Sequence, residues 1–142
     1  MLNCRGCNTA LLPRQYVYCS NLCQRELQYR EWIAEWKQGK KNGGVGVKTG
    51  NFSGHLKKYL HKKFEDKCSI CGWNQKHPKT NRTPLEIDHI DGNSNNNTEK
   101  NLRLICPNCH SLTPYYKNFN KGNGRVWRKE KYIKTGYSKA TV

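Results

Sequence analysis

Hydrophobic residues recur at helical spacing in two segments of the chain. Residues 20–37 begin with a serine suited to the N-cap position of a helix and continue with a rough apolar stripe. Residues 55–66 carry apolar residues on one face and lysines on the other. The stripes consist of Leu22, Leu27, Trp32, Ile33 and Trp36, and of Leu56, Tyr59, Leu60 and Phe64. We therefore expect two helices, with His55 and His61 on the solvated face of the second.

Shorter alternating segments predict strands. Residues 16–18 are typical of a short strand, and residues 85–89 alternate between apolar and polar positions. Asp91 and Gly92 then have turn chemistry, and a polar loop follows to Asn97. Residues 101–105 predict a further strand, with a short helix starting near His110. The order strand, loop, strand, helix describes a ββα unit.

Two segments differ from the rest in composition. Residues 38–54 hold six glycines and three lysines, which favours a flexible basic linker that either lies along a nucleic acid or serves as a plain spacer. Residues 118–142 mix basic and aromatic residues, as in an arm that contacts phosphates, although a weakly ordered tail has the same composition. The expected organisation is a finger and helix in 1–37, the linker in 38–54, a second folded unit in 55–117 and the arm in 118–142.

The eight cysteines occur in close pairs. Mean hydropathy is −1.00 and 35% of residues are hydrophobic, so the core is thin and needs reinforcement by metals or disulfides. The N-terminus shows no secretory signal, and no apolar run approaches the about 20 residues that span a bilayer. We expect a cytoplasmic protein with reduced thiols, which favours zinc over disulfides. The two predicted structural zinc sites are Cys4, Cys7, Cys19 and Cys23, and Cys68, Cys71, Cys106 and Cys109.

The N-terminal quartet has a recognisable layout. Cys4 and Cys7 form a knuckle in which we expect Gly6 to adopt positive φ, and Cys23 lies in the first turn of the predicted helix. A knuckle followed by a helix that carries the last ligand is treble-clef-like. The expected fold is therefore small, α+β and zinc-stabilised.

Charge narrows the choice of partner. The net charge is +16, from 26 Lys and Arg against 10 Asp and Glu. Such an excess favours a polyanion, although a merely soluble basic protein is the plain alternative. A basic membrane-surface binder is disfavoured because the basic residues are not confined to one helix face.

Between the two pairs of the second quartet lie residues suited to phosphodiester hydrolysis. A neutral imidazole such as His89 can act as general base, and a carboxylate such as Asp88 suits a divalent cation that stabilises developing charge. Neighbouring side chains on a strand point to opposite faces. Both residues can serve one site only if the strand bends or one side chain reaches round.

Three runs in order resemble one known family: residues 87–92 (IDHIDG), 101–104 (NLRL) and 106–110 (CPNCH). They are similar to the HNH (ββα-metal) endonuclease motif with its zinc knuckles, above all in small phage-borne homing endonucleases. The resemblance covers about residues 64–117. The N-terminal cysteines are a weaker match to the finger-like starts of some of these proteins.

The resemblance implies a role for each matching residue. His89 would be the general base, and Asp88 and His110 would bind one catalytic Mg²⁺ or Mn²⁺. Asn101 would orient His89 and hold the loop. Pro114 departs from the pattern because it interrupts a long helix after His110. Residues expected to contact double-stranded DNA are Arg103, Lys117, Lys121, Arg125, Arg128 and Lys129.

Two other classes remain open. The chain could be a zinc-braced DNA- or RNA-binding module without catalysis, or an interaction protein whose zinc sites support a docking surface. An intact base and metal ligand favour the nuclease over both. A monomer inside a phage-infected bacterium is expected, and His77 is expected on a loop surface.

Overall fold

The computed structural model describes residues 1–45 and 51–120. The chain divides into two compact units, residues 1–42 and 43–142, and the boundary falls inside the predicted linker. Part of that segment is paired: Gly44 and Phe52 form an antiparallel bridge, supported by a backbone hydrogen bond of 3.0 Å from Ser53 to Gly43. Residues 38–42 of the glycine-rich stretch therefore belong to the first unit, and its described residues 43–45 and 51–54 belong to the second.

The first unit consists of a looped N-terminus and helix α1 (Asn21–Lys37). Ser20 caps the helix, accepting a hydrogen bond from the backbone N–H of Cys23, so the predicted helix is confirmed. Ile33 and Trp36 are buried, whereas Leu22 is 70% exposed and does not belong to the apolar face. Two contacts link the helix to the N-terminal loop: Arg30 donates to the Gly6 carbonyl at 3.0 Å, and Arg5 pairs with Glu31 at 3.2 Å.

The strand predicted for residues 16–18 is wrong. These residues form bends, and the side chains of Tyr16 and Val17 are exposed. The bridge in this unit joins Asn3 to Ala10 instead. A three-residue alternation without a partner strand cannot form a ladder, and the backbone here follows the path that delivers Cys19.

The second unit begins with helix α2 (Gly54–Lys63), which Ser53 caps. Leu56 and Leu60 are fully buried, which confirms the predicted apolar face, but the helix ends three residues before the predicted limit. Glu65 and Asp66 have positive φ and terminate it, and Asp66 bonds to Nδ1 of His61 at 2.6 Å. His61 is half-buried, and His77 lies exposed on a loop as predicted.

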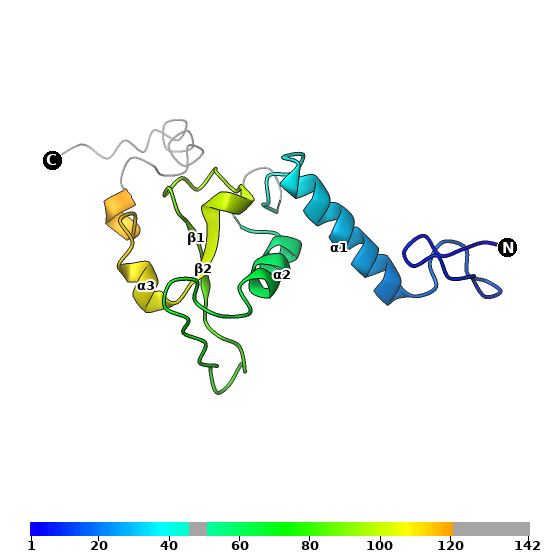
Figure 1. Ribbon diagram of the computed structural model, residues 1–142, viewed down its shortest axis with the longest axis horizontal. Coiled ribbons are helices and arrows are strands. Elements are labelled where there is room, and N and C mark those ends of the chain that lie inside the picture. Colours follow the sequence, from blue (N-terminus) through cyan, green and yellow to red (C-terminus); the bar gives the residue numbers. More distant parts are fainter. Residues whose placement is uncertain (46–50, 121–142) are drawn as a thin grey trace, which may run out of the picture. The chain divides into compact units, whose positions relative to one another are not determined.

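An antiparallel hairpin forms the centre of this unit (Figure 1). Strand β1 (Glu86–His89) pairs with β2 (Leu102–Ile105), so that Asp88 faces Arg103 and His89 faces Leu102. A 3-10 turn, Glu99–Asn101, precedes β2. Helix α2 packs on β2, and α3 (Pro107–Ser111) packs on β1. Leu102, Leu104 and Ile105 are almost completely buried.

Helix α3 is short. It ends before Pro114, as that proline predicted, and a second 3-10 turn follows at Lys117–Asn120. Among the described residues, no helix combines the length and the apolar character needed to cross a bilayer.

Candidate functional site

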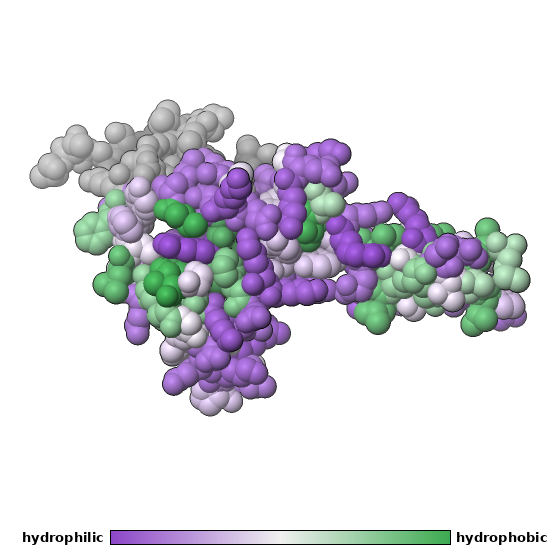
Figure 2. Space-filling model, in the orientation of Figure 1, coloured by the Kyte–Doolittle hydropathy of each residue, from purple (hydrophilic) through white to green (hydrophobic). Residues whose placement is uncertain are grey.

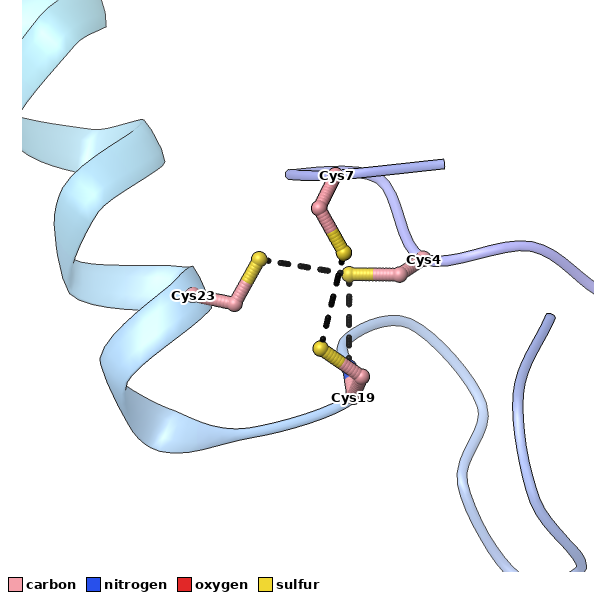
Figure 3. A group of neighbouring side chains, drawn as sticks. All are labelled: Cys4, Cys7, Cys19 and Cys23. Carbon is pink, nitrogen blue, oxygen red and sulfur yellow. Dashed lines mark hydrogen bonds between the residues drawn. The ribbon is translucent and has the colours of Figure 1, made fainter. Parts of the chain in front are cut away.

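The four N-terminal cysteines converge on one point (Figure 3). Their Sγ atoms all lie within 4.8 Å of one another, with 3.5 Å between Cys4 and Cys23 and 3.6 Å between Cys7 and Cys19. Sulfurs that share a tetrahedral zinc ion at about 2.3 Å are about 3.8 Å apart, whereas bonded sulfurs are about 2.05 Å apart. The spacing matches a tetrad that could hold zinc, and it excludes disulfides.

Gly6 is required in this site for a reason other than the one predicted. It is not among the described residues with positive φ, so backbone conformation does not demand glycine there. A Cβ atom at Gly6 would lie 2.5 Å from Sγ of Cys23 and 3.0 Å from its carbonyl oxygen. Glycine is needed because the knuckle and the first turn of α1 approach this closely.

Thiol acidity within the tetrad also favours a bound cation. The backbone N–H of Cys19, 3.3 Å from Sγ of Cys4, contributes most to lowering the pKa of Cys4 to about 6. The hydrogen bond with Cys4 and burial raise the pKa of Cys23 to about 12. One thiolate is therefore readily formed, while a full set of four requires a positive charge between them.

The second tetrad lies in the core of the second unit. Its four Sγ atoms also lie within 4.8 Å of one another, with 3.8 Å between Cys71 and Cys106. Cys68 and Cys106 are buried with Ile105, and Trp73 and Leu85 pack against them. Gly72 follows the first knuckle with a φ of +75°.

Acidity in this tetrad follows the same pattern as in the first. Burial raises the pKa of Cys68, but backbone N–H groups of Cys71, Cys106 and Ile70 outweigh it and bring the value to about 6. The hydrogen bond with Cys71 and burial raise the pKa of Cys109 to about 12. This cluster too could hold zinc.

One face of the hairpin brings together Asp88 and His110. Oδ1 of Asp88 lies 4.0 Å from Nε2 of His110. The other carboxylate oxygen of Asp88 accepts a hydrogen bond of 2.8 Å from Nε of Arg103, its cross-strand neighbour. Nδ1 of His110 is hydrogen-bonded to Glu86, and the ring meets the edge of Tyr116 at 5.2 Å. The Asp88 carboxylate and the His110 ring are thus each fixed by a hydrogen bond on the far side. Oδ1 of Asp88 and Nε2 of His110 remain directed toward each other.

His89 has different neighbours. Its Nε2 atom is 2.7 Å from Oδ1 of Asn97, and its ring lies 5.5 Å from that of Phe52. The strand alternation therefore directs His89 to a different set of contacts from those of Asp88. However, His89 is the last residue of β1, where the chain leaves the hairpin.

Asn101 holds the loop between the strands. Its amide donates to Asp91 and to the Asn96 carbonyl, both at 2.8 Å, and its Oδ1 accepts from the Asp91 backbone at 3.0 Å. Loop bracing is one of the two roles that the resemblance implied for Asn101. The side chain that accepts a hydrogen bond from His89 is that of Asn97 instead.

The carboxylate of Asp91 accepts hydrogen bonds from several residues of this loop. Burial raises the pKa of its carboxyl, but hydrogen bonds from Asn96, the Asn93 backbone and Asn101 outweigh that effect. The pKa of Asp91 is consequently held below its ordinary value. The next residue, Gly92, has a φ of +71°, and a Cβ there would lie 2.4 Å from the ring of Tyr115.

The residues predicted to contact DNA fall into three groups. Arg103 is half-buried and paired with Asp88. Lys117 is exposed, with its ammonium 4.9 Å from the centre of the Tyr116 ring. The remaining four lie outside the described residues: Lys121, Arg125, Arg128 and Lys129.

Sequence reasoning missed three residues that surround the candidate site. Glu86 stands two positions before Asp88 and thus on the same face of the strand, a signal that could have identified it. Asn97 is one of several asparagines in its loop, and Phe52 lies in the glycine-rich segment. Neither carried a distinguishing pattern.

Comparisons with known proteins agree on residues around this site. The family model described as HNH endonuclease matches residues 68–113. The chain is also 48% identical over 56 residues to the H-N-H endonuclease F-TflIV of Escherichia phage T5. That match covers 39% of this chain and 24% of the phage protein, so the chain spans about a quarter of its relative. No solved structure matches the chain.

Proposed function

We propose that this chain, whose residues 68–113 form an HNH endonuclease domain, is a metal-dependent endonuclease that hydrolyses phosphodiester bonds of double-stranded DNA. The observation that carries the proposal is the pair formed by Asp88 and His110 on one face of the hairpin, with 4.0 Å between Oδ1 and Nε2. The net charge of +16 suits a polyanionic substrate.

The geometry of this pair fits one divalent cation. Ligand atoms bound at about 2.1 Å to a cation of the size of Mg²⁺ are at most about 4.2 Å apart. The observed separation is within that limit. Asp88 and His110 would hold Mg²⁺ or Mn²⁺, and two protein ligands leave positions for water and a phosphate oxygen. When bound, the cation stabilises the charge that develops on the phosphorane and on the leaving oxygen.

His89 would be the general base. The Asn97 side-chain oxygen can only accept a hydrogen bond, so Nε2 of His89 carries the proton and Nδ1 has the free lone pair. Nδ1 would take a proton from a water molecule while the water oxygen attacks phosphorus. The bond between phosphorus and the leaving 3′ oxygen breaks in the same step. Asp88 and His89 are adjacent, and adjacent side chains on a strand point to opposite faces. Both can serve one reaction if it occurs at the end of the strand, and His89 is the last residue of β1.

The two cysteine tetrads would each hold one structural zinc ion. Four thiolates close a tetrahedral coordination sphere and leave no position for substrate. In this proposal the N-terminal unit is treble-clef-like, because Cys23 lies in the first turn of α1. The hairpin and α3 would form the ββα-metal unit, with the second zinc fixing the strand–helix junction at Cys106.

Incubation of purified protein with supercoiled plasmid and Mg²⁺ or Mn²⁺ tests the proposal. We expect nicked or linear DNA with either cation and none when Mg²⁺ and Mn²⁺ are both left out. A His110→Ala preparation, purified in parallel, controls for contaminating nucleases. Plasmid that stays intact with both cations would contradict catalysis and favour the zinc-braced DNA-binding module.

The similarity to a phage endonuclease supports a narrower proposal, a homing-type nuclease. Such an enzyme would cut at few positions in a long DNA. Sequencing of the ends produced from a phage-length genome tests this. Ends concentrated at one site would support homing, whereas ends distributed along the molecule would contradict it.

A further inference from the structure

A basic cavity of about 730 Å³ lies between α2 and the loop that leads from it to β1. Lys57, Lys58 and His61 line it from the helix, and Lys76 and Arg82 line it from the loop. The loop is drawn in green at the bottom of Figure 1, and the same region is mostly hydrophilic in Figure 2. The cavity is separate from the residues assigned to catalysis.

Its positive charge is only partly balanced. The carboxylate in the lining, Asp66, is hydrogen-bonded to His61 at 2.6 Å. Within residues 1–45 and 51–120, the side chains of Lys57, Lys76 and Arg82 have no ion-pair or hydrogen-bond partner. Cations gathered on two walls without matching carboxylates favour an anionic ligand.

The lining identifies the class of anion. The cations come from two separate elements, α2 and the loop before β1, which suits the successive phosphates of a backbone. We propose that this cavity is a second DNA-backbone site, which anchors the duplex beside the cleavage centre. The identity of the polymer rests on the proposed function.

The position of the cavity sets the distance between anchoring and cleavage. Leu85 lines the cavity and immediately precedes β1, whereas His89 is the last residue of that strand. Four residues at about 3.3 Å each span about 13 Å. The edge of the cavity therefore lies within about 13 Å of the proposed base, so that one duplex could contact both.

A charge-matched pair of triple variants tests the site. Lys57→Gln, Lys76→Gln and Arg82→Gln together remove the three unpaired cations of the cavity. Lys62→Gln, Lys79→Gln and Lys100→Gln remove three exposed cations of the same unit that do not line it. Zinc content and circular dichroism establish that both proteins are folded.

DNA affinity is measured without added Mg²⁺ or Mn²⁺, where cleavage is not expected and no chelator removes the structural zinc, over a series of salt concentrations. We expect the cavity variant to bind about tenfold or more weakly at low salt, and its log–log salt slope to fall by about one unit for each lost contact. A slope equal to that of the control variant would overturn the proposal. So would saturable binding of inorganic phosphate together with an unchanged DNA slope, since the cavity would then serve a small ligand.

The outcomes separate this inference from the proposed function. A protein that never cleaves DNA but loses affinity through the cavity variant fails the nuclease proposal and retains the anchoring site. A protein that cleaves plasmid but shows equal salt slopes for the two variants supports the nuclease proposal and overturns the anchoring site. Duplexes with one uncharged phosphate then locate the contact relative to the cut.

Discussion

The carboxylate of Glu86 is hydrogen-bonded to Nδ1 of His110, on the opposite side of the imidazole from Asp88. This bond fixes the ring orientation and leaves Nε2 as the atom available to a cation. A carboxylate behind a metal-binding histidine also increases the basicity of the ligand. In the proposed site, Glu86 would therefore be a positioning residue that acts through His110.

We expect Glu86→Gln to weaken catalytic metal binding by about 10- to 100-fold while leaving zinc content unchanged. The neutral amide keeps the size of the side chain but loses the charge that supports the imidazole. Cleavage rates measured over a range of Mn²⁺ concentrations give the apparent affinity. Glu31→Gln, in the other unit, is the control; equal Mn²⁺ curves for both variants would exclude a role for Glu86.

We expect His89→Ala to lose about 10²-fold or more in cleavage, the scale of general-base catalysis, because alanine cannot accept a proton. It removes no cysteine and no positive cluster, so folding and DNA affinity are expected to persist. Single-turnover cleavage, and DNA binding without added Mg²⁺ or Mn²⁺, check both. Cutting at the parent rate in Mg²⁺ would show that His89 is not the base.

Asp88→Ala should behave differently from His89→Ala, because it removes a metal ligand and leaves the base intact. Higher Mn²⁺ is expected to restore part of its activity, whereas His89→Ala should not respond. The contrast is read from the same cation series. Identical responses of the two variants would contradict the division of roles.

We expect two zinc ions per folded chain by elemental analysis, and about one after Gly6→Ala. A methyl group at that position would lie 2.5 Å from Sγ of Cys23, so the first tetrad cannot close around an ion without a shift. Gly54→Ala is the matched control, because nothing lies within 4 Å of a Cβ there. One zinc or none in the parent protein would refute the tetrad assignment, and two in Gly6→Ala would refute the steric argument.

We expect the stabilising effect of Asp91 to depend on pH. Its pKa is lower in the folded chain than its ordinary value of 3.8, so the contribution is complete above that value and is lost as pH falls through the folded pKa. Urea unfolding of the parent and of Asp91→Asn measures it as a difference in stability. The difference should be constant from pH 5 to 7 and shrink below about pH 3.8. A difference that grows on acidification would have the wrong sign.

Features encoded by local spacing could be predicted from the sequence. The cap at Ser20, the apolar face of α2, the two cysteine quartets and the alternation of β1 all lie within short windows, and the structure shows the corresponding helices and hairpin. The identity of the catalytic residues came from the resemblance and stays a prediction.

Features that depend on distant partners could not be predicted. Leu22 has the right period for the apolar face of α1, but no segment that the structure describes covers it. The contacts of His89 with Phe52 and Asn97 join segments of different composition, and only the folded chain brings them together. The segment predicted as a linker pairs at Gly44 and Phe52 because a bridge requires two segments to meet, which composition does not reveal.

Cys106 has two structural roles. Its Sγ atom caps α3 by accepting a hydrogen bond of 3.4 Å from the backbone N–H of Cys109, and the same atom belongs to the second tetrad. His110 is the next residue after Cys109, so the sulfurs of the candidate zinc site also set the turn that presents the imidazole. Oxidation of these sulfurs would release the ion and remove the cap together. Nuclease activity would then be tied to the reducing capacity of the surroundings, although no sulfur takes part in the hydrolysis.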